Sequence, residues 1–335
     1  MTVEQFVQAV VISVLIIVSL LTGFAYLTLL ERRVLARIQV RIGPNRAGPL
    51  GLLQPVADGV KLIFKEELIP TQADKVIFVL APIITLIPAL IILAVVPLGP
   101  PIELFGRTIT LGLAPAINVG VLYLMAVSSI SVYGIVLAGW SSNNKYSLMG
   151  ALRSSAQMIS YELALGLAFI GPILLAGSMS LQAIVDGQAS VWYIFYQPIG
   201  FVVFLLASIA EVNRAPFDMP EAEQELTAGY HTEYSGMKFS LFFMAEYIKM
   251  AAVSAIGASL FFGGYRGPFV DAVPALGPLY FFLKVLLGLA VMIWIRATLP
   301  RIRYDRLMAF GWKVMLPLSL LNLLATGAIV LARQS

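Results

Sequence analysis

Residues 76–97 read VIFVLAPIITLIPALIILAVVP, an uninterrupted apolar run without a charged side chain. A helix of about 20 such residues spans the hydrocarbon core of a bilayer. Similar, predominantly apolar stretches occur at 6–30, 111–138, 156–177, 191–210, 239–262, 279–298 and 314–332. The runs are too continuous for the alternating strands of an outer-membrane barrel. We therefore predict one integral membrane domain, residues 1–335, built as an all-α bundle of about eight transmembrane helices.

The composition excludes several other classes of protein. The chain of 335 residues is 59% hydrophobic and 12% charged, with a mean hydropathy of +0.90, whereas a soluble domain carries about 25% charged residues. A soluble globular protein, a disordered chain and a nucleic-acid binder are thereby excluded. The chain has no cysteine and one histidine, His231. Cysteine-ligated zinc or iron–sulfur clusters and a bis-histidine haem cannot be built from it, so redox cofactors are expected on partners.

The distribution of basic residues predicts the orientation of the helices. The connections 31–75, 139–155, 211–238 and 299–313, with Arg296 counted beside the last of them, hold 17 Lys and Arg residues. The other connections and the two ends of the chain hold 3. Cytoplasmic loops carry the excess of Lys and Arg. We therefore expect the four long connections in the cytoplasm and both termini on the outer side.

Two features of the connection 31–75 suggest contact with the membrane surface. A polar stripe at helical spacing, with apolar residues on the other side, predicts a short amphipathic helix lying in the interface; its members are Gln54, Asp58, Lys61 and Lys65. Arg33, Arg37 and Arg41 form a basic stripe if the first helix continues beyond the bilayer. Anchoring to anionic headgroups explains this stripe, and docking of an acidic soluble partner is the alternative.

The connection 211–238 concentrates acidic residues close to the membrane. Its acids are Glu211, Asp218, Glu221, Glu223, Glu225 and Glu233. Aromatic residues such as Phe217 and Tyr230 and two prolines interrupt them, unlike a plain solvated charge run. Packed acids near a membrane have raised and coupled proton affinities through desolvation and mutual repulsion. The pattern favours proton uptake or coupling, with a solvated acidic loop as the alternative.

Ionisable residues inside the predicted helices are the second signal of function. Glu162 lies within the fourth helix, and Glu246 and Lys249 share a face of the sixth and could pair. Such residues are costly in a membrane and mark functional sites by default. For Glu31 and Lys284 the alternative is snorkelling from a helix end. For His231 a structural role in the loop is the alternative to relaying protons.

Four strings carry a resemblance to a known family: ERRVLARIQVRIGPNRAGPLGLLQPVADGVKLIFKE at 31–66, KYSLMGALRSSAQMISYELALGL at 145–167, EVNRAPFDMPEAEQELTAGYHTEYSGMKFSLFFMAEY at 211–247 and WIRATLPRIRYDRLM at 294–308. Together they closely resemble the H subunit of the proton-pumping NADH–quinone oxidoreductases, respiratory complex I. The resemblance runs from about residue 24 to 320 and includes eight helices. It implies a membrane subunit beneath the peripheral arm, in a bacterial-type inner membrane.

The resemblance also implies the division of labour in the complex. Quinone is the substrate, FMN and iron–sulfur clusters lie on partner subunits, and this chain binds no cofactor or metal and has no catalytic residue in isolation. The acids of the connection, Asp218, Glu221, Glu223, Glu225 and Glu233, would line the link between quinone cavity and membrane. Glu162, Glu211 and Glu246 would continue the path inside the bilayer. The quinone cavity and its entrance would be framed by Glu31, Arg32, Arg33, Phe217 and Tyr230.

Three other functions remain compatible with the sequence. Membrane-bound [NiFe] hydrogenases and related complexes use a homologous subunit, often without quinone. A stand-alone cation/proton antiporter would also carry buried acids and lysines, although it would more typically show discontinuous helices in matched halves. A purely structural anchor would carry the acids incidentally.

Overall fold

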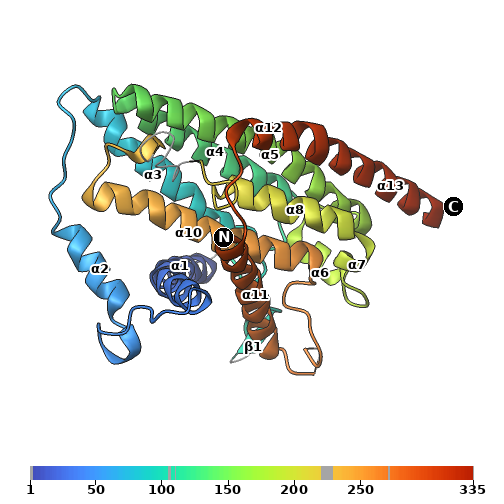
Figure 1. Ribbon diagram of the computed structural model, residues 1–335. Helices are drawn as coiled ribbons and strands as arrows, with labels where there is room; N and C mark the ends of the chain where they lie inside the picture. The colour runs from blue at the N-terminus through green and yellow to red at the C-terminus, as the bar shows by residue number, and fades with distance from the viewer. Residues whose placement is uncertain (1–2, 105–106, 110, 220–228, 271, 335) are drawn as a thin grey trace.

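The computed structural model describes residues 3–104, 107–109, 111–219, 229–270 and 272–334, and the fold is a helical bundle (Figure 1). The long helices are α1 (Val3–Ile38), α3 (Lys75–Ile91), α4 (Gly120–Ser141), α5 (Lys145–Ala176), α8 (Pro198–Glu211), α10 (Gly236–Phe261), α11 (Leu276–Thr298) and α13 (Leu316–Gln334). The shorter ones are η1 (Pro49–Gly51), α2 (Gln54–Ile63), η2 (Ile92–Val95), α6 (Leu181–Asp186), α7 (Tyr193–Tyr196), η3 (Gly229–His231), α12 (Tyr304–Phe310) and the π-helical turn η4 (Gly311–Met315). Strands β1 (Ile102–Leu104) and β2 (Arg107–Ile109) form a small antiparallel hairpin, with Glu103 opposite Thr108.

Within the described residues, seven helical segments are long and apolar enough to cross a membrane. The polytopic helical bundle predicted from the sequence is therefore confirmed. The stretch 191–210 is divided into α7 and α8, because Pro198 cannot continue the preceding helix and instead opens the next one. At 14 residues, α8 is about 21 Å long, shorter than the roughly 30 Å of bilayer hydrocarbon. The eighth span stays a prediction.

Several helices extend beyond their apolar runs. The segment 139–155, expected as a loop, is helical apart from residues 142–144, because α5 already begins at Lys145. Asn144 caps this helix through its side-chain oxygen, which accepts a hydrogen bond from the Tyr146 backbone N–H at 2.9 Å. Likewise α1 continues to Ile38, and helical structure resumes at Tyr304. Polar residues lower hydropathy without ending a helix, so hydropathy alone places these boundaries too early or too late.

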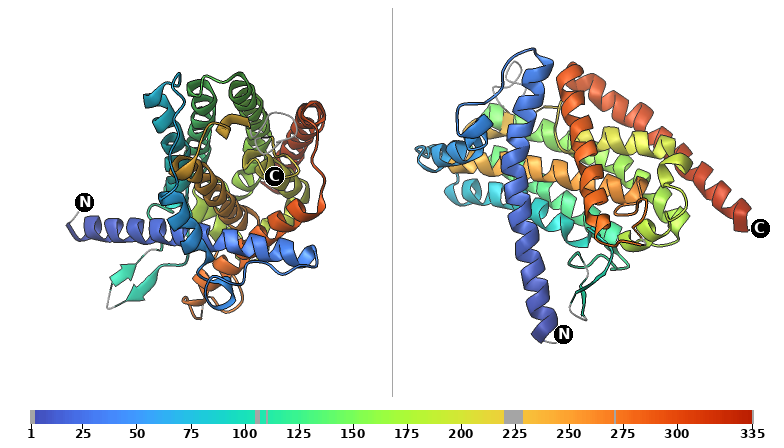
Figure 2. Two further views of the ribbon diagram at one scale, coloured as in Figure 1. Left: turned by 60° about the vertical axis from the view of Figure 1, so that its left-hand side comes forward. Right: turned by 90° about the horizontal axis from the view of Figure 1, so that it is seen from below.

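Five of the long helices form a bundle, and two other helices cross it. Helices α3, α4, α5, α8 and α10 run alongside one another, whereas α1 and α11 lie across this bundle next to α10 (Figure 2). Small residues permit the closest approaches: a Cβ atom on Gly134 of α4 would lie 2.8 Å from the backbone nitrogen of Thr85 on α3. The core of the bundle consists of aromatic and aliphatic side chains. The ring centroids of Phe204 and Phe261, for example, are 5.3 Å apart.

Candidate functional site: a buried charge network above a polar cavity

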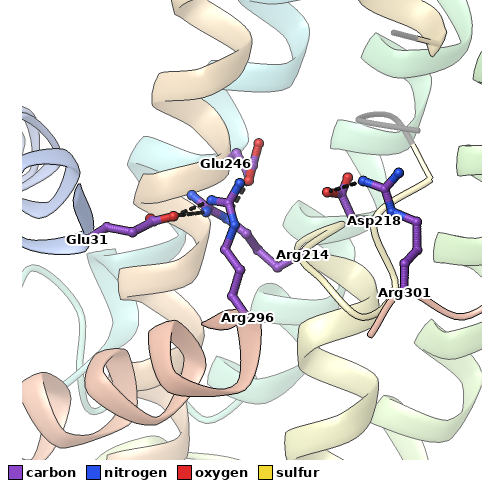
Figure 3. Close-up of polar contacts among 6 residues, drawn as sticks. All are labelled: Glu31, Arg214, Asp218, Glu246, Arg296 and Arg301. Atoms are coloured by element: carbon purple, nitrogen blue, oxygen red, sulfur yellow. Dashed lines mark hydrogen bonds and ion pairs between the residues drawn. The ribbon is translucent and has the colours of Figure 1, made fainter. Parts of the chain in front are cut away.

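Four charged side chains from three helices and one connection form a buried network (Figure 3). Arg214 Nη1 donates to both carboxylate oxygens of Glu31 on α1, at 2.9 and 3.1 Å. Its Nε atom lies 2.5 Å from the carboxylate of Glu246 on α10. Arg296 at the end of α11 donates to Glu31 as well. Glu31 and Arg214 are 3% and 4% exposed, whereas the side chains of Glu246 and Arg296 are 20% and 24% exposed. Charges therefore join α1, α10 and α11 around a buried Glu31–Arg214 pair.

The end of α8 directs Arg214 into this network. The helix ends at Glu211, and Asn213 adopts a positive φ of 55°, a left-handed conformation that asparagine accommodates. The Arg214 backbone N–H then donates to the carbonyl of Ile209 at 3.2 Å. From α5, the buried amide of Gln157 donates to the carbonyls of Ala210 and Phe217 at 2.8 and 2.7 Å. The turn is thereby fixed from both sides.

The environment of Arg214 favours its charged form. Burial acts to lower the pKa of the guanidinium, but the carboxylates of Glu246 and Glu31 outweigh it and raise the pKa above its ordinary value. The guanidinium also lies 4.1 Å from the ring centroid of Tyr247, a cation–π contact. Arg214 therefore stays a cation that both acids share.

A second ion pair ties the connection 211–238 to the segment before α12. Arg301 Nη2 lies 3.1 Å from the carboxylate of Asp218, which is 3% exposed (Figure 3). The Ile302 backbone N–H donates to the carbonyl of Pro216 at 3.1 Å. Asp218 is thus held at a defined position beside the charge network.

A small polar cavity lies between the connection 211–238 and the interior of the bundle; we call it the central cavity. Its polar wall contains three of the predicted acids, a lysine, a histidine, a tyrosine and an asparagine: Glu211, Asp218, Glu246, Lys249, His231, Tyr230 and Asn213. A second, smaller cavity, lined by Ser128 among others, also touches Glu211 and Lys249. Lys249 donates to Ser131 of α4. Ionisable groups therefore follow one another from the connection into the bundle.

The shared face of Glu246 and Lys249 matches the sequence prediction, since both line the same cavity. Their expected pairing differs from the structure, in which Arg214 is the ion-pair partner of Glu246. Sequence spacing identifies neighbours within one helix but does not show that a connection about 30 residues away in the chain supplies a stronger partner.

Two predicted path residues lie away from the central cavity. Glu162 accepts a hydrogen bond from Ser129 and lines an outer groove between α4 and α5. Glu233 accepts from the Asn144 amide at 2.6 Å and lines a separate pocket. Glu221, Glu223 and Glu225 lie outside the described residues.

The residues expected at the quinone cavity occupy three kinds of environment. Arg32 is half-exposed and bonds Asp58 of α2 at 2.7 Å, and Arg33 is partly buried next to it. Phe217 is fully buried, with its ring centroid 5.6 Å from that of Tyr161. Tyr230 lines the central cavity.

Neither Glu31 nor Lys284 extends its charged group from a helix end into the aqueous interface, which was the alternative considered for both. Glu31 is buried in the charge network, so that alternative is wrong. The Lys284 amino group donates to the carbonyls of Phe262, Gly264 and Arg266 at 2.7, 2.8 and 2.6 Å. It closes the end of α10, where backbone carbonyls lack helical partners.

Sequence reasoning missed the cations of the site, Arg214, Arg296 and Arg301. One signal was present. Arg214 is the only Lys or Arg between Glu211 and Glu233 in the acidic connection, and a single permanent cation among acids is a strong candidate for a buried partner. Arg296 and Arg301 gave no such signal because they resemble ordinary basic anchors at a helix end.

The fold and site together define a class: a polytopic membrane protein that holds paired and clustered charges inside a helical bundle. Residues 11–327 match the model of a family described as NADH dehydrogenase. Similar proteins include the second of the NADH-quinone oxidoreductase H subunits of Geobacter metallireducens, 54% identical over 96% of this chain and 95% of the relative. The corresponding H subunit of Thermomicrobium roseum is 52% identical over 94% of this chain and 96% of the relative.

A third relative, the NADH-quinone oxidoreductase H subunit of Protochlamydia amoebophila, is 53% identical over 92% of this chain and 94% of its own length. The chain belongs to this family, the H subunits of the NADH–quinone oxidoreductases. It is therefore a multi-pass membrane subunit of an oxidoreductase, complex I, whose other subunits are its partners. The resemblance found in the sequence is confirmed, and the stand-alone antiporter is wrong.

Proposed function

We propose that this subunit forms part of the quinone cavity and the beginning of a proton path that starts at the connection 211–238. The setting is a bacterial inner membrane, with the long connections in the cytoplasm and both termini on the outer side. FMN and iron–sulfur clusters on partner subunits deliver the electrons. The absence of cysteine in this chain agrees with that arrangement, because it offers no thiolate ligand for a cluster.

The central cavity is the observation that carries the proposal. It brings Asp218 of the connection into one space with Glu246, Glu211 and Lys249. Carboxylates that share a poorly solvated space influence one another's proton affinity. A change of charge near the connection is therefore felt by the acids inside the bundle.

Arg214 transmits this change of charge. It contacts Glu31 and Glu246 at once. Protonation of Glu246 weakens its attraction to the guanidinium and leaves Arg214 held by Glu31. Uptake of protons during quinone reduction thus changes how strongly Arg214 is held by Glu246 and by Glu31. The proton affinities of Glu211 and Lys249, which share the cavity with Glu246, change in turn.

An apolar cavity beside the charge network supports quinone as the ligand. It lies between α1, α10 and α11, with walls that include Leu27, Leu30, Phe24 and Tyr247. Leu30 precedes Glu31, and the Tyr247 ring contacts Arg214. An isoprenoid tail requires an apolar wall of this kind, and a headgroup requires polar residues at its end.

Glu162 extends the path toward the neighbouring membrane subunits. Its carboxylate faces an outer groove rather than the central cavity. An acid at that depth is costly unless another polar group satisfies it. Proton transfer from Glu211 through this groove to a partner completes the proposed route.

Neutral variants of the cavity acids in the assembled complex test the proposal. Glu246→Gln and Asp218→Asn are compared with Asp186→Asn, an acid of α6 that pairs with Arg266 away from the cavity. We expect at least about tenfold slower NADH–quinone turnover for the first two and normal turnover for the third. Ferricyanide reduction by NADH measures the integrity of the electron-input arm. Unchanged turnover and unchanged protons pumped per NADH in Glu246→Gln and Asp218→Asn would overturn the proposal.

The electron donor is tested separately by purification of a tagged chain in mild detergent. Flavin- and cluster-bearing NADH-oxidising subunits are the expected companions, together with antiporter-like membrane subunits. Recovery with a nickel–iron hydrogenase instead would contradict the quinone reaction and retain only the architecture.

A further inference from the structure

His231 is a buried titratable residue that the proposed proton path does not yet use. It is the only histidine of the chain and ends the short turn η3. Its side chain is 8% exposed and lines the central cavity together with Glu211, Asp218 and Glu246. A buried imidazole in the same cavity as three carboxylates can exchange protons with them, which a residue needed only for packing would not have to do.

Aromatic rings from η3 and α10 lie against the imidazole of His231. Its ring centroid lies 5.0 Å from that of Tyr230, 5.3 Å from Phe239 and 6.2 Å from Phe243. Phe242 packs on Tyr230 and Tyr234 at 5.3 and 5.0 Å. We call these five rings the aromatic collar: Tyr230, Tyr234, Phe239, Phe242 and Phe243. The phenylalanines of the collar neither bind nor release protons.

The sequence of α10 places His231 between the connection and the acids. Phe239, Phe243 and Glu246 follow one another at intervals of four and three residues, so they share one face of the helix. His231 contacts the two phenylalanines, and Glu246 lies about 4.5 Å further along the axis than Phe243. The imidazole therefore lies at the wall of the cavity that Asp218 of the connection and Glu246 share.

The charges around the cavity determine how His231 responds to protons. Asp218 from the connection, Glu211 from α8 and Glu246 from α10 favour the imidazolium, while Lys249 from α10 opposes it. Tyr230 is the titratable neighbour on η3, and the cavity residues of α3 and α4, Thr85 and Ile135, are uncharged. Histidine is the side chain whose unperturbed charge changes between pH 5 and 8, which suits a group that must both accept and release protons.

We propose that His231 carries protons across the aromatic collar, an inference that rests on the proposed proton path. The neutral imidazole takes a proton from water on the side of the connection and becomes an imidazolium. It then gives a proton to a carboxylate of the cavity and returns to the neutral form. One proton enters and one leaves, with no other reactant.

Replacement by glutamine tests the transfer, because His231→Gln keeps hydrogen-bonding groups but cannot titrate. In the assembled complex we expect roughly tenfold slower NADH–quinone turnover at pH 7. This is less than the ~100-fold lower end of general acid–base contributions, since cavity water offers a parallel route. We expect the pH profile of the wild-type complex to have an inflection between pH 5 and 8 and the profile of the variant to lack it. Ferricyanide reduction and Asp186→Asn serve as the controls.

Deuterium exchange at the imidazole C2 position, followed by mass spectrometry, tests the wild-type protein directly. As the only histidine of this subunit, His231 gives an unambiguous peptide. The exchange rate is expected to follow a titration curve between pH 5 and 8, which shows that solvent protons reach the ring. A rate that is flat across this range would overturn the proposal even if the glutamine variant failed to assemble.

The variants distinguish the histidine step from the proton path. Normal turnover and an unaltered pH profile in His231→Gln, with slow turnover in Glu246→Gln, would overturn the histidine step and leave the proton path intact. Normal turnover in both, with Asp218→Asn also normal, would overturn the path itself.

Discussion

Replacement of Arg214 by methionine removes the cation that two buried acids share. The substitution keeps an unbranched apolar stem but deletes the guanidinium, and with it the contacts to Glu31 at 2.9 and 3.1 Å and to Glu246 at 2.5 Å. The cation–π contact with Tyr247 is lost as well. Two carboxylates then remain without this partner, Glu31 with 3% and Glu246 with 20% of its side chain exposed.

The expected cost follows from which acid keeps a partner. Removal of one member of a buried ion pair destabilises a protein by about 3–5 kcal/mol. Glu31 retains Arg296, so the lower end of that range applies to Arg214→Met. A loss of about 3 kcal/mol corresponds to roughly a 100-fold change in the unfolding equilibrium.

A second substitution separates lost attraction from buried charge. Glu246→Gln in the Arg214→Met background removes the carboxylate that has lost its guanidinium. Apolar or neutral replacements of a whole buried pair are often close to neutral, so we expect the double variant to recover about 2 kcal/mol. Arg303→Met is the matched control, because its pair with Asp305 is exposed at 77% and 62% and contributes about 1 kcal/mol at most.

Unfolding of the purified full-length chain in mixed dodecyl maltoside and SDS micelles, followed by far-ultraviolet circular dichroism, measures these differences. The single variant should unfold at clearly lower SDS fractions, and the double variant should move back toward wild type. An Arg214→Met variant within about 1 kcal/mol of wild type, by the limit for an exposed pair, would refute the reasoning. A double variant less stable than the single one would refute it equally.

Four further substitutions test other parts of the structure in the same unfolding assay. Gly150→Ala is expected to lower the free energy of unfolding by about 1–3 kcal/mol, because its Cβ would lie 2.5 Å from the backbone of η3. The control Gly59→Ala has free space around its Cβ and should be neutral or stabilising. Equal effects of the two substitutions would contradict this. Burial acts to raise the pKa of Asp58, but Arg32 outweighs it and holds the pKa below its ordinary value of 3.8. The stability difference between wild type and Asp58→Asn should therefore be fully present above pH 3.8 and be lost as the pH falls through the lowered pKa; a difference independent of pH would contradict it. Lys284→Met should lower the free energy of unfolding by about 2–3 kcal/mol, because it leaves three backbone carbonyls without their hydrogen-bond donor. A decrease no larger than that of Asp58→Asn would show that the amino group does not cap the end of α10.

The fold was predictable because its signal is local. Runs such as 76–97 identify a membrane helix from composition alone, and the stripe from Gln54 to Lys65 predicted the amphipathic α2. Helix ends were less accessible. The Asn144 cap sets the beginning of α5 through one side-chain hydrogen bond, about eleven residues before the apolar run begins, and a hydropathy average does not register a single contact.

The site was predictable in its acids but not in its pairings. Glu211, Asp218 and Glu246 attract notice because carboxylates are rare in such a chain, and the cavity brings them together. The sequence does not place Glu31 beside Arg214, since 183 residues separate them and only the crossing of α1 over α10 brings them into contact. Long-range pairing depends on tertiary packing, and one sequence contains no direct record of it.

The central claim is that acids inside the bundle change their protonation when quinone is reduced. Infrared difference spectra of the assembled complex, NADH-reduced minus oxidised, test it through the carbonyl stretching band of protonated carboxyl groups. Glu211, buried at 7% exposure between the two cavities, should contribute such a band. The account predicts that this band is lost in Glu211→Gln and retained in Asp186→Asn. A spectrum that is identical in wild type and in Glu211→Gln, with quinone turnover intact, would contradict it.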